Sequence, residues 1–181
     1  MAKHHIMLDI ETLDTVPGAT VLSVGAVKFD PYNANTEPYE QTLWLPSLEQ
    51  QLDAGRTTSE STLEWWAKQD AEILARALEE HGRVDVTEFF RDLNRYLVGA
   101  DKIWCQGPQF DMVILEDLYR QFDHHYNWAF WQVCDSRTVF NMMPVDPRKA
   151  IQQDAHDAAA DAYYQAVALQ ISFDHFGVQP R

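Results

Sequence analysis

Cysteine and basic residues are both scarce in this sequence of 181 residues. Two cysteines, Cys105 and Cys134, are too few for a disulfide framework, and they suit a protein of the reducing cytoplasm. Lysine and arginine number 14 against 28 acidic residues, so the formal net charge is -14. This charge argues against broad electrostatic attraction to nucleic acid or to an anionic membrane. It does not exclude a nucleic-acid enzyme, because bound divalent cations reverse the local charge of an acidic site.

Long apolar runs are absent as well. No stretch approaches the length of a membrane span, and the N-terminus lacks the pattern of a secretory signal peptide. We therefore expect a cytoplasmic protein that makes no membrane contact. The length and a hydrophobic content of 46% predict a single domain over residues 1–181, large enough to bury a substantial core.

What is present is an orderly succession of strand and helix patterns. Apolar or alternating segments predict strands at about 4–10, 20–30, 39–45, 102–106 and 131–135. Amphipathic segments predict helices at about 58–69, 70–81, 86–99, 110–122, 136–143 and 158–176. Gly25 within the second strand indicates a close approach by another element. Three strands followed by alternating helices and strands predict an α/β fold with a mixed sheet flanked by helices.

The first strand carries two acidic residues, Asp9 and Glu11. Side chains two positions apart on a strand share one face, so these carboxylates lie side by side while Leu8 and Ile10 face the core. Two adjacent carboxylates stay ionised only near a positive charge or under water. A solvated strand face is the commoner explanation, and a divalent metal held by oxygen ligands is the alternative. The choice depends on whether other acids reach the same place.

A third acid, Asp111, lies at the start of the helix predicted at 110–122. It precedes Ile114 and Leu115 by three and four residues, so it points toward the buried face of that helix. One interpretation is an N-cap carboxylate that accepts hydrogen bonds from free backbone N–H groups. The other is a member of an acidic site.

The segment before the last helix contains His156 and Asp161. Their spacing of five would put them roughly 140° apart on a regular helix, so they share a site only if His156 precedes the helix. Asp157 is a good N-cap residue, which would start the helix at Ala158. Small alanine side chains in this helix would let it approach the sheet and bring Asp161 near Asp9. A surface histidine is the simpler interpretation of His156 taken alone.

These acids fall within short motifs that occur in a fixed order. The motifs are Asp-Ile-Glu-Thr at 9–12, Ser-Val-Gly-Ala at 23–26, Phe-Asp at 110–111, and His156 with Asp161. Together they resemble the DEDDh exonuclease superfamily, whose fold is ribonuclease H-like. Ser-Thr-Leu-Glu-Trp-Trp at 61–66 and Asp-Ser-Arg-Thr at 135–138 resemble the subgroup that contains phage exonuclease A and a mycobacterial exoribonuclease.

The resemblance implies a 3'-5' exonuclease that releases 5'-mononucleotides from the 3' ends of single-stranded DNA or RNA. It implies two Mg²⁺ or Mn²⁺ ions, with His156 as the general base for the attacking water. The metal ligands would be Asp9, Glu11, Asp111 and Asp161. A catalytically weak ribonuclease H-like binding module is the alternative, which the loss of a carboxylate would have favoured. Exposed tryptophans suggest a homodimer.

Substrate contacts are predicted for a further group of residues near these motifs. Leu13 and Phe110 flank the acids and could stack against the last bases, because stacking on apolar side chains tolerates any base. Packing in the core is an equally good explanation of these two residues. Trp65 and Trp66 diverge by about 100° on a helix, so one can be core while the other faces the cleft. Relatives often have Gly-Asn-Gly where this chain has Cys-Gln-Gly at 105–107, and Arg137 could bind a phosphate or form a structural ion pair. The predicted substrate-binding residues are Thr12, Leu13, Trp66, Gln106, Phe110 and Arg137.

Overall fold

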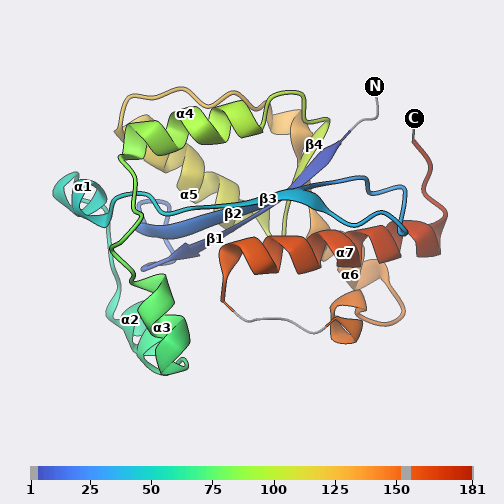
Figure 1. The fold of residues 1–181 in the computed structure, drawn as a ribbon, viewed down its shortest axis with the longest axis horizontal. Helices are drawn as coiled ribbons and strands as arrows, with labels where there is room; N and C mark the ends of the chain where they lie inside the picture. Colours follow the sequence, from blue (N-terminus) through green and yellow to red (C-terminus); the bar gives the residue numbers. More distant parts are fainter. Residues whose placement is uncertain (1–3, 152–155, 181) are drawn as a thin grey trace.

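The computed structural model describes residues 4–151 and 156–180 and has a mixed five-stranded sheet at its centre (Figure 1). The strands lie in the order β3-β2-β1-β4-β5. The first three are antiparallel neighbours, whereas β4 and β5 run parallel to β1. The strands are β1 His5–Thr12, β2 Val21–Phe29, β3 Tyr39–Trp44, β4 Lys102–Cys105 and β5 Val133–Asp135.

Helices cover both faces of this sheet. In the view of Figure 1, α4 and α5 lie above the sheet, and α6 and α7 lie below it. This arrangement confirms the predicted mixed sheet flanked by helices. The helices are α1 Leu48–Asp53, α2 Glu60–Ala67, α3 Ala71–Ala77, α4 Val86–Tyr96, α5 Pro108–Gln121, α6 Ser136–Met142 and α7 Ala158–Phe176, with 3-10 turns η1 Phe130–Gln132 and η2 Pro147–Ala150.

Strand β1 separates two hydrophobic cores. Leu8 and Ile10 are buried in the core between the sheet and helices α4 and α5. Met7 is buried in the core between the sheet and α7. Full burial of each such side chain contributes about 1.5–3 kcal/mol, so the register of β1 is strongly fixed. The alternation therefore holds Asp9 and Glu11 on the α7 side of the sheet, as predicted.

Helix α7 runs unusually close to the sheet at Gly25. A Cβ atom at Gly25 would lie 2.1 Å from the backbone C and O atoms of Ala158, so only glycine fits there. Ala162 and Ala166 are fully buried against the sheet in the same helix. The predicted close approach to Gly25 is confirmed, and its partner is the first turn of α7.

The strand predicted at about 131–135 begins only at Val133, because its first two residues belong to the 3-10 turn η1. Two further short elements, α1 and η2, were not predicted. Helix α1 is positioned by the buried side chain of Gln51, whose Oε1 accepts from Val21 N at 2.8 Å and whose Nε2 donates to Val21 O at 2.9 Å. The turn η2 begins after Asp146, whose carboxylate accepts from Arg148 N at 3.0 Å. Tertiary hydrogen bonds and local capping hold these two segments in place. Neither segment therefore needs the periodic apolar residues from which a helix is predicted.

Two surface features bear on the remaining predictions. None of the helices in the described part of the chain is long and apolar enough to cross a bilayer. Phe130 and Trp131, in η1, are 83% and 65% exposed. Trp131 and Trp65, which is 41% exposed, are thus tryptophans at the surface, and the homodimer stays a prediction.

Candidate active site

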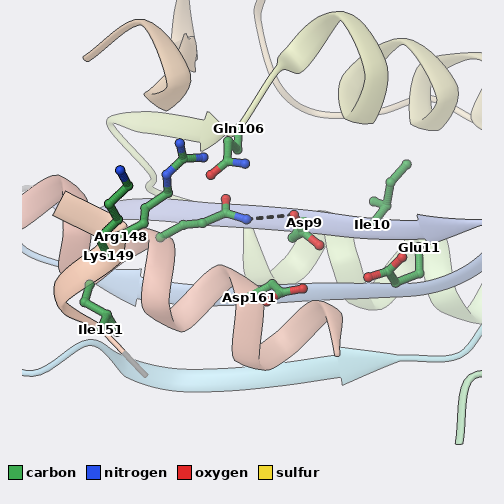
Figure 2. A pocket seen from close by; sticks show the side chains of 9 residues that line it. Asp9, Ile10, Glu11, Gln106, Arg148, Lys149, Ile151 and Asp161 are labelled. Carbon is green, nitrogen blue, oxygen red and sulfur yellow. Dashed lines mark hydrogen bonds between the residues drawn. The ribbon is translucent and has the colours of Figure 1, made fainter. Parts of the chain in front are cut away.

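Three elements bring the candidate acids to one place. Asp9 and Glu11 lie on β1, Asp111 on α5 and Asp161 on α7. Figure 2 shows the carboxylates of Asp9, Glu11 and Asp161 around one space. That space is a cavity of about 480 Å³, lined by Asp9, Ile10, Glu11, Gln106, Arg148, Lys149, Ile151, Asp161 and Gln165.

Asp111 lies behind this cavity. It is 5% exposed, and its Oδ1 atom accepts a hydrogen bond from Ile10 N at 3.2 Å. Helix α5 begins after Gly107, so Asp111 is not its N-cap residue. Of the two interpretations of Asp111, the structure therefore supports the acid that faces β1.

Asp9 is held by a partner that the sequence analysis missed. The Nε2 atom of Gln165 donates to Asp9 Oδ1 at 2.9 Å, drawn as the dashed line in Figure 2. Gln165 follows Asp161 by four residues, so both point to the same face of α7. Its other amide atom, Oε1, is buried without a hydrogen-bond partner among the described residues. The helix spacing alone could have identified this residue.

Burial makes the cluster a poor environment for four negative charges. Loss of solvent contact is the largest cause of the raised pKa of each acid. For Asp9 and Glu11, repulsion from neighbouring carboxylates raises the pKa further. The pKa of Asp9 lies well above its ordinary value. The pKa is raised to about 8 for Glu11, to about 7 for Asp111 and to about 6 for Asp161. A divalent cation bound by oxygen ligands would relieve both effects, so the donor set fits such an ion.

His156 lies at the edge of the cluster, immediately before the N-cap of α7. Asp157 caps the helix by accepting from Ala159 N and Ala160 N at 3.0 Å each, as predicted. His156 has a positive φ of 65°, a strained conformation for a residue other than glycine. One potential ligand atom each from Glu11, His156 and Asp161 lie within 4.8 Å of one another. The histidine therefore shares the site although it stands outside the helix.

Burial and a ring contact set the protonation and the surroundings of His156. Burial lowers the pKa of its imidazole, which keeps the ring neutral and able to accept a proton at pH 7. The ring of Trp65 packs against it in a T-shaped contact, with centroids 4.7 Å apart. Trp65 is 41% exposed, whereas Trp66 is 2% exposed. Of the two tryptophans, Trp65 thus presents the larger surface beside the histidine.

A second cavity, of about 320 Å³, adjoins the acidic one. Ile10 and Glu11 line both cavities, so the two spaces are contiguous along β1. The floor of the second cavity is tied to β1, because Trp66 Nε1 donates to Thr12 O at 2.9 Å. The remaining lining side chains are mostly apolar or hydroxylated: Thr12, Thr15, Ser61, Thr62, Trp65, Trp66 and Phe110.

The other predicted contact residues have definite places. Leu13 is buried in a small core with Leu22, Leu48 and Trp66, which favours its packing role. Gln106 lines the acidic cavity. The exposed Arg137 donates from Nη2 to Gln106 O at 2.7 Å, so it supports the loop that carries Gln106. Contact of any of these residues with a substrate stays a prediction.

Two cations of the acidic cavity, Arg148 and Lys149, were not predicted from the sequence. They belong to η2 and come to the cavity because η2 packs against α7. No periodicity or motif marks this turn, so nothing in the sequence connected it with Asp9.

The strand order, the helices on both faces and the acids at the centre of the sheet define a ribonuclease H-like exonuclease fold. The chain belongs to the family described as the Rv2179c-like 3'-5' exoribonuclease domain, which matches residues 4–173. The resemblance to the DEDDh exonucleases is thereby confirmed. The chain is a 3'-5' exonuclease family member, which is the coarser part of the predicted function.

Several individual proteins are similar to this chain. An exodeoxyribonuclease of Enterobacteria phage T4 is 29% identical over 125 residues, which are 63% of this chain and 55% of the phage protein. E. coli exonuclease I, in a zinc-bound complex with single-stranded DNA, has a TM-score of 0.68 at 14% identity and covers 97% of this chain. The matched part is 41% of the exonuclease I chain. The chain thus spans about half the length of these two relatives.

A third relative matches over nearly its whole length. The nuclease domain of 3'hExo, a DEDDh family member bound to rAMP, has a TM-score of 0.60 at 11% identity. The match covers 98% of this chain and 96% of that domain. At such low identity the solved structures establish the fold, and the family match establishes the exonuclease class.

Proposed function

We propose that this chain is a metal-dependent 3'-5' exonuclease that hydrolyses the terminal phosphodiester of single-stranded DNA or RNA and releases 5'-mononucleotides. The observation that carries the proposal is the gathering of four carboxylates at the centre of the sheet, three of them lining one cavity and Asp111 buried next to β1, with a neutral histidine at the edge of the cluster. No carboxylate of the set is lost, which disfavours the alternative of a catalytically weak binding module.

The donor set indicates which residues would hold metal. Asp111 is buried and Asp9, Glu11 and Asp161 are half-buried, and all four are oxygen donors with raised pKa values. Oxygen donors of this kind are the ligands that Mg²⁺ and Mn²⁺ prefer. Two such ions, when bound, supply charge stabilisation for the phosphodiester and a more acidic attacking water.

The protein side chains have separate tasks in this reaction. His156 takes a proton from the water as its oxygen attacks phosphorus. The bond from phosphorus to the 3' oxygen of the penultimate nucleotide breaks, and that oxygen takes a proton from solvent water to become the new 3'-hydroxyl. Gln165 holds Asp9 in one orientation throughout, because its amide is itself buried in α7. The chemistry thus needs both a fixed acid and a proton acceptor.

The second cavity suits the terminal nucleoside. Phe110 and Trp65 offer apolar surface for a base, and base stacking on such surface is independent of sequence. Thr12 and Trp66 fix the wall of this cavity against β1, and Gln106 lies on the opposite side of the acids. With the terminal base in the second cavity, the last phosphodiester would lie over Asp9.

Matched DNA and RNA oligonucleotides test the proposal. Each is labelled at its 5' end and carries either a free 3'-hydroxyl or a 3'-phosphate, and each is incubated with Mg²⁺, Mn²⁺ or EDTA. We expect a ladder that shortens from the free 3' end, 5'-mononucleotides as products, and no cleavage with EDTA. Asp9→Asn should be inactive. Cleavage from the 5' end, or an Asp9→Asn protein with full activity, would refute the assignment.

A further inference from the structure

The acidic cavity has one basic end. Arg148 and Lys149 line it from η2, and they are the cations among its described lining residues. Figure 2 shows them on the same side of Asp9 as Gln106, whereas Glu11 lies on the opposite side. In a chain with a formal net charge of -14, these two cations thus lie directly beside the candidate acids.

Arg148 is fixed in position by its neighbours. Its Nε and Nη2 atoms donate to the two carboxylate oxygens of Asp146 at 2.9 and 2.7 Å. Its guanidinium also lies over the ring of Phe140, 5.4 Å from the centroid, within the range of a cation–π contact. The Nη1 group forms no hydrogen bond with the described residues, so it can bind a ligand without disrupting this arrangement.

Lys149 is exposed and differs from Arg148 in having no ion pair with the described part of the chain. Neither cation is paired with Asp9, Glu11 or Asp161, although all five residues line one cavity. Cations that face a cavity without pairing with its acids are available to an anionic ligand. For a polyanionic strand, they also offset part of the repulsion from the rest of the molecule.

The order of the chemical environments along β1 assigns a direction to that ligand. The apolar cavity surrounds Thr12, the acids follow at Glu11 and Asp9, and the cations lie beyond Asp9. A strand with its last base in the apolar cavity and its last phosphodiester at the acids must continue toward the cations.

We propose that Arg148 and Lys149 bind backbone phosphates of the substrate on the 5' side of the scissile bond. The inference rests on the proposed function, since it assumes a strand that enters by its 3' end. It predicts that the two cations contribute only when such upstream phosphates exist. They would therefore distinguish a polynucleotide from a single nucleotide ester.

The experiment compares two substrates. One is a single-stranded oligonucleotide, and the other is the p-nitrophenyl ester of thymidine 5'-monophosphate, which has a scissile phosphate but no upstream strand. Lys149→Gln should lower the ratio of kcat/KM for the oligonucleotide over that for the ester by roughly two- to fivefold, the upper part of the range of an exposed charge contact. Lys149→Glu should lower it further. Arg91→Gln and Arg91→Glu, at an exposed position on α4, are the charge-matched controls and should leave the ratio within twofold.

Binding provides a second readout that does not depend on hydrolysis. Fluorescence anisotropy with a 3'-blocked oligonucleotide at several salt concentrations should give a log–log slope that is shallower by about 0.7 for Lys149→Gln, corresponding to one lost phosphate contact on a single strand. Thermal unfolding would verify that each variant is folded.

The outcomes separate the two proposals. Equal losses on both substrates would overturn the inference, because the cations would then act at the scissile phosphate. A Lys149→Glu protein that behaves like Arg91→Glu in both assays would also overturn it. Lys149-dependent binding by a wild-type protein that hydrolyses neither substrate would support the phosphate contact and refute the exonuclease.

Discussion

His156 and Asp161 are close in the chain, but the structure gives them different environments. Asp161 is part of α7, whereas His156 precedes the helix cap and packs against Trp65. We expect His156→Ala to lower turnover by roughly 10²–10⁴, the usual effect of losing a general base, and to keep the metal-induced rise in melting temperature. Asp161→Ala should lose both turnover and most of that rise.

Steady-state kinetics at saturating metal and thermal unfolding with and without Mn²⁺ make this comparison. Because a ligand atom of His156 lies within 4.8 Å of ligand atoms of Glu11 and Asp161, the histidine could instead bind metal directly. A His156→Ala protein that loses the metal-induced shift as completely as Asp161→Ala would establish that role and exclude the base.

Gln165 provides a residue-scale test of how the acids are oriented. Gln165→Leu removes the hydrogen bond to Asp9 and, with it, the buried Oε1 atom that lacks a partner. We expect turnover to fall by about 10–100-fold, as for other groups that orient metal ligands, while the free energy of unfolding changes little. Gln165→Asn, which keeps the amide on a shorter stem, is the comparison. A Gln165→Leu protein with wild-type turnover would show that Asp9 needs no such support.

At the scale of elements, the approach of α7 to β2 decides whether the site forms. Gly25→Ala places a Cβ atom 2.1 Å from the backbone of Ala158, a clash that no side-chain rotation can relieve. We expect a loss of roughly 1–3 kcal/mol in the free energy of unfolding and weaker metal binding, because Asp161 moves with the helix. Chemical denaturation and metal titration measure the two effects.

Gly18→Ala is the matched control for this prediction. A Cβ atom at Gly18 would meet nothing within 4 Å, so the change should alter the free energy of unfolding by less than about 0.5 kcal/mol. If Gly25→Ala were as stable and as active as Gly18→Ala, the close packing of α7 would not be needed to place Asp161.

The contrast between α7 and η2 explains what could be predicted from the sequence. The bounds of α7 followed from its cap residue Asp157 and from apolar residues at gaps of three and four, which are local signals. The shared face of Asp9 and Glu11 followed from the strand period alone. The position of Arg148 depends on how η2 packs against α7, and no local signal encodes such packing. The motif resemblance supplied the connection between distant acids that periodicity could not.

At the scale of the whole molecule, the raised pKa values link stability to pH. A carboxyl group whose pKa is raised by folding stabilises the folded state below its unfolded pKa, and this contribution is lost as pH rises through the folded value. For Glu11 and Asp111 the folded values are about 8 and about 7. We therefore expect the melting temperature of the metal-free protein to fall between pH 6.5 and 8.5.

Added Mg²⁺ or Mn²⁺ should reverse this trend. The ions bind the ionised carboxylates, so the metal-induced rise in melting temperature should be larger at pH 8.5 than at pH 6.5. The pH range of this comparison begins at 6.5 because of His5, whose pKa burial lowers from 6.5 to about 4. This histidine lowers the stability of the folded protein only below pH 6.5. Glu11→Gln should flatten the metal-free profile. A metal-induced rise that is the same at both pH values would contradict the buried acidic site.

Asp9 and Gln165 are joined by a hydrogen bond although 156 positions separate them in the chain. Because ribosomes make a chain from its N-terminus, β1 is synthesised long before α7. A growing polypeptide therefore carries the acids of β1 and α5 without Asp161 or His156. Its site stays incomplete until α7 has emerged and packed against the sheet.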